Sequence, residues 1–196
     1  MTYYSFFLKY YRKAAEKMCA DCKDFIAKGS KILDLGCGSG VIGKYFQDFF
    51  QAEVIGVDIE DKRVENIPFK IIDGVNLPFA DNSFDTVLIA YVLHHASDPM
   101  SLLREAKRVT RKNIIIYEDL PEGFFGRILC GFHGITFNIF LQKKKQKHHF
   151  KKVEEWEEIF ANLGLKNFFS KKIVANYTIA YIAYPVKRFF FVLEKK

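Results

Sequence analysis

The stretch Lys31-Ile-Leu-Asp-Leu-Gly-Cys-Gly-Ser-Gly40 decides how this chain of 196 residues folds. Its first five residues are typical of a short buried strand, with Ile32, Leu33 and Leu35 as the apolar side chains, and glycines follow at alternate positions. Glycine lets a backbone turn sharply and approach a ligand closely. A helix expected over residues 41–50 would direct its free N–H groups at that ligand. The order of strand, glycine turn and helix predicts a nucleotide-type site at the end of the first strand.

Strand-like and helix-like segments alternate along the chain, which predicts βαβ units and an α/β fold. We expect Asp98 to cap a helix that has Pro99 at its first position, and Gly164 to end the last helix. The expected strands are 31–35, 53–57, 69–72, 85–90, 113–117, 165–175 and 188–193, and the expected helices are 3–27, 41–50, 98–108 and 153–163.

The same loop also satisfies the dinucleotide-binding pattern G-x-G-x-x-G, through Gly38, Gly40 and Gly43. Two details argue against a nicotinamide-dependent oxidoreductase. The pattern starts late, because Gly36 is already the first glycine after the strand. Asp34 places a carboxylate at the strand end, where it would repel a pyrophosphate but attract an ammonium group.

The pattern D-x-G-x-G-x-G, from Asp34 to Gly40, resembles motif I of the class I S-adenosylmethionine-dependent methyltransferases. The resemblance continues through Val54–Asp58, Ile72–Phe79, Asp81–Ala90 and Val92–His95, and covers residues 31–117. It implies a three-layer Rossmann-like α/β fold with a mostly parallel seven-stranded sheet in the order 3-2-1-4-5-7-6, strand 7 being antiparallel. It also implies a single methyltransferase domain over 1–196, with 1–29 as an N-terminal helical cap and 121–152 as a lid over the acceptor site.

The resemblance further implies that the chain binds S-adenosyl-L-methionine and releases S-adenosyl-L-homocysteine. Asp34 would face the methionine amino group, and Asp58 would bind the two ribose hydroxyls. The loop residues that would admit the methionine and the sugar are Gly36, Cys37, Gly38 and Gly40.

On the adenine side, Ile59 would pack on the ring and Asp73 would accept from its amino group, with Gly74 and Val75 beside it. The carbonyl of Ala90 would lie near the methionine amine. Strands often end in turn-forming aspartate, so a purely structural role stays open for Asp58 and Asp73. Ten residues separate Asp58 from Phe69, where family members usually have a longer helix, so we expect a more open adenine side.

Methyl transfer from a sulfonium requires alignment, exclusion of water and, for some acceptors, removal of a proton. His95 and Tyr91 are the residues we expect on the catalytic side. The other candidates for a base are His94, Glu118, Asp119, His133, His148 and His149. A structural hydrogen bond is the alternative role for His94 and His95. The segment Ala90-Tyr-Val-Leu93 lacks the Asn/Asp-Pro-Pro-Tyr/Phe tetrapeptide, which counts against amino-methylation of nucleic-acid bases.

Residues 124–141 are apolar, with Arg127 as their one charged residue, and six lysines follow between Lys143 and Lys152. This pattern fits a lid over a hydrophobic acceptor beside a solvated loop, or a contact with an anionic membrane surface. The net charge of +7 permits anionic partners, but the sequence has no recognised nucleic-acid module. The likeness to the quinone and small-metabolite branch favours a small or lipid-like acceptor.

Composition excludes several classes of protein. With 49% hydrophobic and 27% charged residues the chain is globular, and four cysteines exclude a disulfide scaffold. Cys19 and Cys22 form a C-x-x-C without a second pair or a nearby histidine, so we expect packing and no metal site. No signal peptide or long apolar run is visible, and we expect a cytoplasmic monomer or homodimer, with peripheral membrane contact as the alternative. The alternative functions are cofactor binding without turnover and methylation of RNA or protein.

Overall fold

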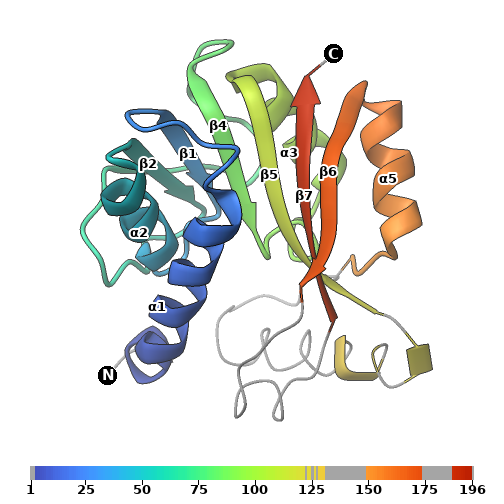
Figure 1. The fold of residues 1–196 in the computed structure, drawn as a ribbon, viewed down its shortest axis with the longest axis horizontal. Coiled ribbons are helices and arrows are strands. Elements are labelled where there is room, and N and C mark those ends of the chain that lie inside the picture. The colour runs from blue at the N-terminus through green and yellow to red at the C-terminus, as the bar shows by residue number, and fades with distance from the viewer. Residues whose placement is uncertain are drawn as a thin grey trace.

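The computed structural model describes residues 3–121, 123–124, 126, 128–130, 149–173 and 187–195, with the backbone alone for residues 3–7. Its helices are α1 (Tyr3–Cys22), α2 (Val41–Phe50), α3 (Pro99–Val109) and α5 (Val153–Asn162). Its strands are β1 (Lys31–Leu35), β2 (Glu53–Asp58), β3 (Phe69–Ile71), β4 (Phe84–Ala90), β5 (Thr110–Leu120), β6 (Leu165–Ile173) and β7 (Lys187–Lys195). Figure 1 shows these strands as one twisted sheet with helices on both faces.

The sheet has the order β3-β2-β1-β4-β5-β7-β6. The pairs β1–β2, β1–β4, β2–β3 and β4–β5 are parallel, whereas β7 runs antiparallel to both β5 and β6. This arrangement confirms the predicted fold class and strand order. The carboxyl ends of β1, β2 and β4 therefore meet at one edge, where the glycine loop begins.

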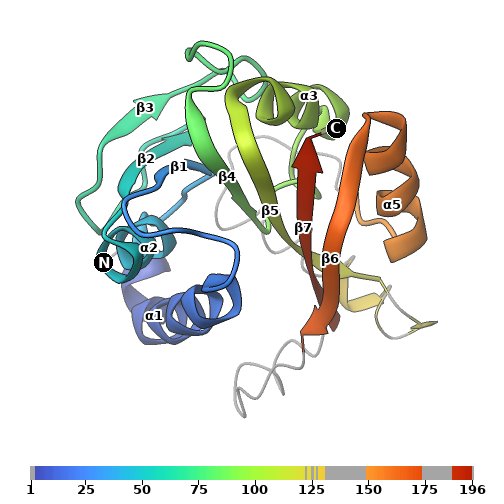
Figure 2. The ribbon, with the colours of Figure 1, turned by 45° about the horizontal axis from the view of Figure 1, so that its top comes forward.

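Each face of the sheet carries its own hydrophobic core. Leu33 and Leu35 of β1 pack with residues of α3 and α5, including Trp156 and Phe160. Ile32 lies in the other core, against residues of α1 and α2. Figure 2 shows the two pairs of helices on opposite sides of the sheet. Because both faces are covered, β1 and β4 are almost continuously buried, as parallel strands usually are.

Most element bounds agree with the predictions to within a few residues, and β1 and α2 agree fully. Helix α1 ends at Cys22, five residues earlier than expected, because the chain turns before β1 and Gly29 adopts a φ of 74°. Strand β5 is longer than expected because β7 pairs along it as far as Leu120. Asp98 caps α3 as predicted, its carboxylate accepting the Ser101 N–H at 3.0 Å.

Cys19 and Cys22 lie buried in the core between α1, α2 and the sheet, and the Cys22 sulfur lies 3.3 Å from the Tyr117 hydroxyl. Most of the expected lid at 121–152 falls outside the described residues, as do His133, His148 and Lys143–Lys147. The division into a cap, a domain and a lid remains a prediction. Among the described helices, none has the length and apolar character to cross a membrane.

Candidate active site

The glycine loop after β1 turns back across the neighbouring strand ends. The N–H groups of Gly36 and Cys37 both donate to the Val57 carbonyl of β2, at 2.8 and 3.1 Å. Gly36 has a φ of 75°, and a Cβ added to it would lie 2.4 Å from Cγ2 of Val92. A side chain at position 36 would therefore clash with the segment that follows β4. The thiol of Cys37 is buried, and burial raises its pKa.

Asp58 ends β2 and faces this loop. Its two carboxylate oxygens accept the N–H groups of Gly38, at 2.9 Å, and of Ile59, at 2.7 Å. Burial raises its pKa, although these hydrogen bonds oppose the rise. Each carboxylate oxygen can accept more than one hydrogen bond. Asp58 therefore retains capacity for two neighbouring hydroxyls beside the glycine loop.

Asp34 lies beneath the loop, between β1 and α2, and is 2% exposed. A Cβ added to Gly43 of α2 would lie 2.8 Å from its Oδ2 atom, and this oxygen has no hydrogen-bond partner among the described residues. Burial raises the pKa of Asp34 to about 7, and the nearby charge of Asp58 adds to the rise. A contact with the methionine amino group stays a prediction for this buried residue.

The loop after β3 contains Asp73, which is exposed and organises the turn. Its carboxylate accepts the backbone N–H groups of Val75 and Asn76, at 2.9 and 2.7 Å, and the Asn76 side-chain amide at 2.6 Å. The amide of Asn76 holds the pKa of Asp73 below its ordinary value. Ile59 is 46% exposed and lies beside Gly74. The predicted adenine residues are thus brought together, although the Val75 N–H is already engaged.

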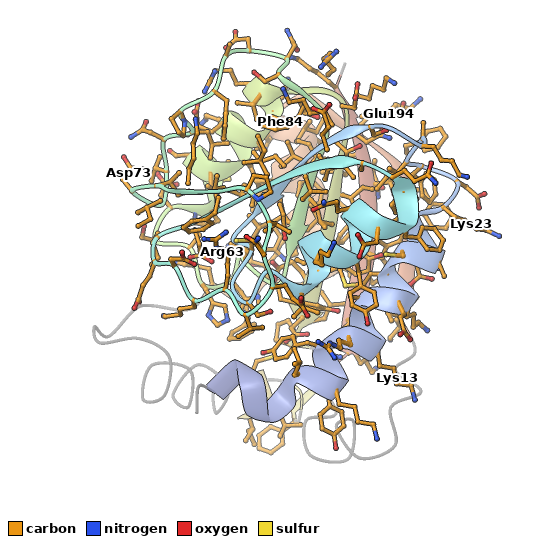
Figure 3. The ribbon with its side chains drawn as sticks, turned by 90° about the vertical axis from the view of Figure 1, so that its left-hand side faces the viewer. Lys13, Lys23, Arg63, Asp73, Phe84 and Glu194 are labelled. Carbon is orange, nitrogen blue, oxygen red and sulfur yellow. The ribbon has the colours of Figure 1, made fainter. Side chains whose placement is uncertain are left out.

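Residues 59–68, all of them described, contain no helix and cross directly over the glycine loop. The Val64 N–H donates to the Ser39 carbonyl at 2.8 Å, and Arg12 of α1 forms a 3.0 Å ion pair with Glu65. Arg63 pairs with Asp61 at 2.8 Å (Figure 3 labels Arg63 and, in the loop after β3, Asp73). The short linker that the sequence shows is therefore fastened to the loop itself.

Arg108 of α3 fastens the loop after β3, an arrangement that the sequence analysis missed. Its guanidinium donates to the carbonyls of Leu77, at 3.0 Å, and Phe79, at 2.8 Å. Glu105 pairs with Arg108 at 2.7 Å and accepts the Leu77 N–H at 3.0 Å. The contacts with Leu77 and Phe79 join residues about thirty positions apart, and no local sequence pattern signals them.

The chain leaves β4 at Ala90 through a strained residue. Tyr91 has a φ of 61°, a left-handed conformation that costs a non-glycine residue about 1–3 kcal/mol. Its N–H donates to the Tyr117 carbonyl at 2.8 Å, and the Arg188 guanidinium lies 5.3 Å from its ring centre. Arg188 also pairs with Asp119 at 3.0 Å. The turn directs the chain from the end of β4 to the histidines that follow.

His94 pairs with a carboxylate. Its Nδ1 lies 2.5 Å from Oε2 of Glu118, and both side chains are 1% exposed. His95, the residue that the sequence favoured as the base, is half-buried, and its ring centre lies 4.0 Å from that of His94. The sequence analysis named both histidines and Glu118 as candidates, but it could not pair them.

Comparisons with known proteins agree with this geometry. Residues 33–117 match the model of a methyltransferase domain family. An uncharacterized methyltransferase of Schizosaccharomyces pombe is 34% identical over 106 residues, which cover 44% of this chain and 38% of that protein. A demethylmenaquinone methyltransferase of Thermotoga maritima is 33% identical over 111 residues, which cover 50% of this chain and 48% of that protein. The matches therefore span less than half the length of these curated relatives.

The structure of a S-adenosylmethionine-dependent methyltransferase from Methanosarcina mazei superposes with a TM-score of 0.69 at 17% identity, covering 89% of this chain and 96% of that one. A likeness at this identity is evidence for the fold. Residues 33–117 thus resemble a methyltransferase domain, and the described chain has the Rossmann-like fold of these structures.

Proposed function

We propose that this chain transfers a methyl group from S-adenosyl-L-methionine to a small or lipophilic acceptor by in-line displacement. The observation that carries the proposal is Asp58, whose carboxylate closes the glycine loop through the Gly38 N–H and faces the space beside it. A carboxylate with two accepting oxygens suits vicinal ribose hydroxyls. The matched methyltransferase domain includes this residue and the whole loop.

The residues present fit the cofactor in two further ways. Gly36 has a φ of 75° and packs directly against Val92, so it provides the tight turn that a cofactor-binding loop needs. Asp34 holds a buried carboxyl oxygen without a partner in the described structure, which favours a cationic ligand nearby. The bound cofactor supplies an electrophilic methyl group on a sulfonium. The chain's own residues bind it, orient the acceptor and exclude water.

The acceptor that we propose to test first follows from the relatives. The Thermotoga maritima protein is named as a demethylmenaquinone methyltransferase. A short-chain demethylmenaquinone analogue, offered in its reduced form, should therefore stimulate release of S-adenosyl-L-homocysteine. The fully methylated menaquinone analogue is the matched control and should give no stimulation. Tight cofactor binding without product release, with this and with other acceptors, would favour a binding protein over an enzyme.

A contact between the Lys143–Lys152 segment and anionic membranes is a second, separate proposal. Each lysine near an anionic surface contributes about 1 kcal/mol of attraction, and salt weakens that attraction. Co-sedimentation with anionic vesicles should therefore fall as salt rises, and should be lost when Lys143, Lys144, Lys145 and Lys147 are replaced by serine. Neutral vesicles are the control. Equal binding of the wild type and the fourfold variant would contradict this proposal.

A further inference from the structure

His94 and Glu118 form a buried pair next to the cofactor loop. Val92, two residues before His94, is the side chain that fills the space against Gly36. Glu118 lies on β5, one residue beyond Tyr117, which pairs with Ala90 at the end of β4. One Glu118 oxygen lies 2.5 Å from Nδ1 of His94, and the other accepts the Leu93 N–H at 2.8 Å. The carboxylate therefore fixes both the ring and the backbone that carries it.

This pairing determines how the ring can exchange a proton. When Nδ1–H donates to a carboxylate, the neutral ring has its lone pair on Nε2, the atom that can accept a further proton. Burial disfavours the charged ring, but the charge and hydrogen bond of Glu118 outweigh burial and raise the pKa of His94. The charged or titratable groups that face His94 are its partner Glu118, together with Asp119, His95, His149 and Arg188, the last paired with Asp119.

Residues 149–150 cover this pair. The His149 N–H donates to the His94 carbonyl at 2.8 Å. The Phe150 ring stacks on the His94 ring, with centres 4.6 Å apart and planes 20° apart. A flat aromatic ring thus already lies against the imidazole in this structure. An aromatic ligand of similar size could take the same place if Phe150 moved aside.

We propose that the His94–Glu118 pair removes the proton of a hydroxyl on an aromatic acceptor, which replaces Phe150 against the His94 ring. This inference rests on the proposed methyl transfer and adds the class of acceptor and the group that takes the proton. His94 is the base, and Glu118 is a positioning residue that acts through it. The same logic of a carboxylate orienting a histidine operates in hydrolase triads.

The step balances as follows. The acceptor O–H bond breaks and its proton moves to Nε2 of His94, whose positive charge the Glu118 carboxylate offsets. The acceptor anion forms a bond to the methyl carbon while the carbon–sulfur bond breaks, leaving a neutral thioether. If the bond forms at the ring carbon beside the hydroxyl, the hydrogen of that carbon moves to the oxygen as a proton. In either case His94 then returns one proton to water.

A chromogenic phenol tests this proton transfer without any turnover. 4-Nitrophenol absorbs visible light when ionised, so the titration is read by absorbance in the presence of S-adenosyl-L-homocysteine. At a pH below the pKa of the free phenol, wild-type protein should raise its ionised fraction several-fold. His94→Gln should abolish the rise and Glu118→Gln should weaken it. His95→Gln tests the alternative base, and Asp48→Asn, which changes an exposed carboxylate of α2, is the matched control and should retain the rise.

Three results would each overturn the proposal. The wild-type protein could fail to bind nitrophenol, or could bind it without ionising it. The ionisation could also be lost in His95→Gln and retained in His94→Gln. Thermal unfolding identifies any variant that fails to fold. Phe150→Ala supplies a second test, because removal of the covering ring should tighten nitrophenol binding several-fold; unchanged affinity would show that the acceptor does not take that place. Failure of the proposed methyl transfer can be told apart from failure of this inference. In the first case calorimetry would show no cofactor binding. Nitrophenol ionisation can still be measured then, because the assay is also run without cofactor.

Discussion

Asp58 combines two roles, one in the turn and one proposed toward the cofactor. Its hydrogen bonds to Gly38 and Ile59 organise the loop, and the same oxygens are the proposed acceptors for ribose hydroxyls. Asp58→Ala should weaken S-adenosylmethionine binding by about 1.5–3 kcal/mol, or roughly one to two decades of affinity. Asp48→Ala, which removes an exposed aspartate of α2, is the matched control for calorimetry. If a folded Asp58→Ala variant binds S-adenosylmethionine with unchanged affinity, Asp58 acts only as a turn residue.

Asp34 makes stability depend on pH. Burial raises its pKa from 3.8 to about 7, so the folded protein holds this proton more tightly than the unfolded chain. The free energy of unfolding should therefore fall as pH rises through this interval, by about 4 kcal/mol at most.

The matching measurement is urea unfolding of the wild type and Asp34→Asn at several pH values from about 4 to about 8. The amide cannot ionise, so the variant should show a flatter dependence on pH, and Asp48→Asn should behave like the wild type. Parallel curves for the wild type and Asp34→Asn would mean that Asp34 is already ionised when folded.

At the scale of elements, α3 holds the loop after β3, which is the proposed adenine side. Arg108 bonds two carbonyls of that loop, and Glu105 bonds one of its N–H groups. Arg108→Ala should loosen residues 73–79 and weaken cofactor binding by about 1 kcal/mol, roughly fivefold. Hydrogen exchange of these amides should rise together with the dissociation constant. Arg104→Ala, one turn earlier on the exposed side of α3, should change neither quantity.

The length of the linker between β2 and β3 was enough to predict that it lacks the longer helix usual in the family. Ten residues leave no room for a full helix, and the chain instead crosses the glycine loop, bonding to the Ser39 carbonyl. The sequence did not predict the contacts that fix the linker over the glycine loop. The ion pairs Arg63–Asp61 and Arg12–Glu65 depend on which of many surface charges meet in space.

At the scale of the whole molecule, the motifs predicted the sheet through a family resemblance. The glycine loop, the acidic residue at the end of β2 and the motifs around β4 follow the order found in the class I methyltransferases, and that resemblance implied the strand order that the structure confirms. The His94–Glu118 pair carries no such signal, because 24 positions separate its members and a second histidine stands beside the first. Local patterns therefore located the cofactor loop, whereas the acceptor side required three-dimensional contacts.

The acceptor is the property that the fold determines least, because one fold hosts many chemistries. In this chain the proposed acceptor side consists of residues that follow β4 and β5 together with residues 149–150 and Arg188. These come from parts of the chain far apart in sequence, most of them at the edge of or beyond the matched domain at 33–117. Similarity over that domain therefore informs on the cofactor more than on the acceptor.

The glycine loop and Asp58 are the proposed site for a sulfonium nucleoside. Calorimetric titration of the wild-type chain with S-adenosylmethionine, S-adenosylhomocysteine and NAD tests this proposal most directly. We expect saturable binding of the first two, a clear loss of affinity in Asp58→Ala, and no binding of NAD. Tight binding of NAD with no response to S-adenosylmethionine would contradict it.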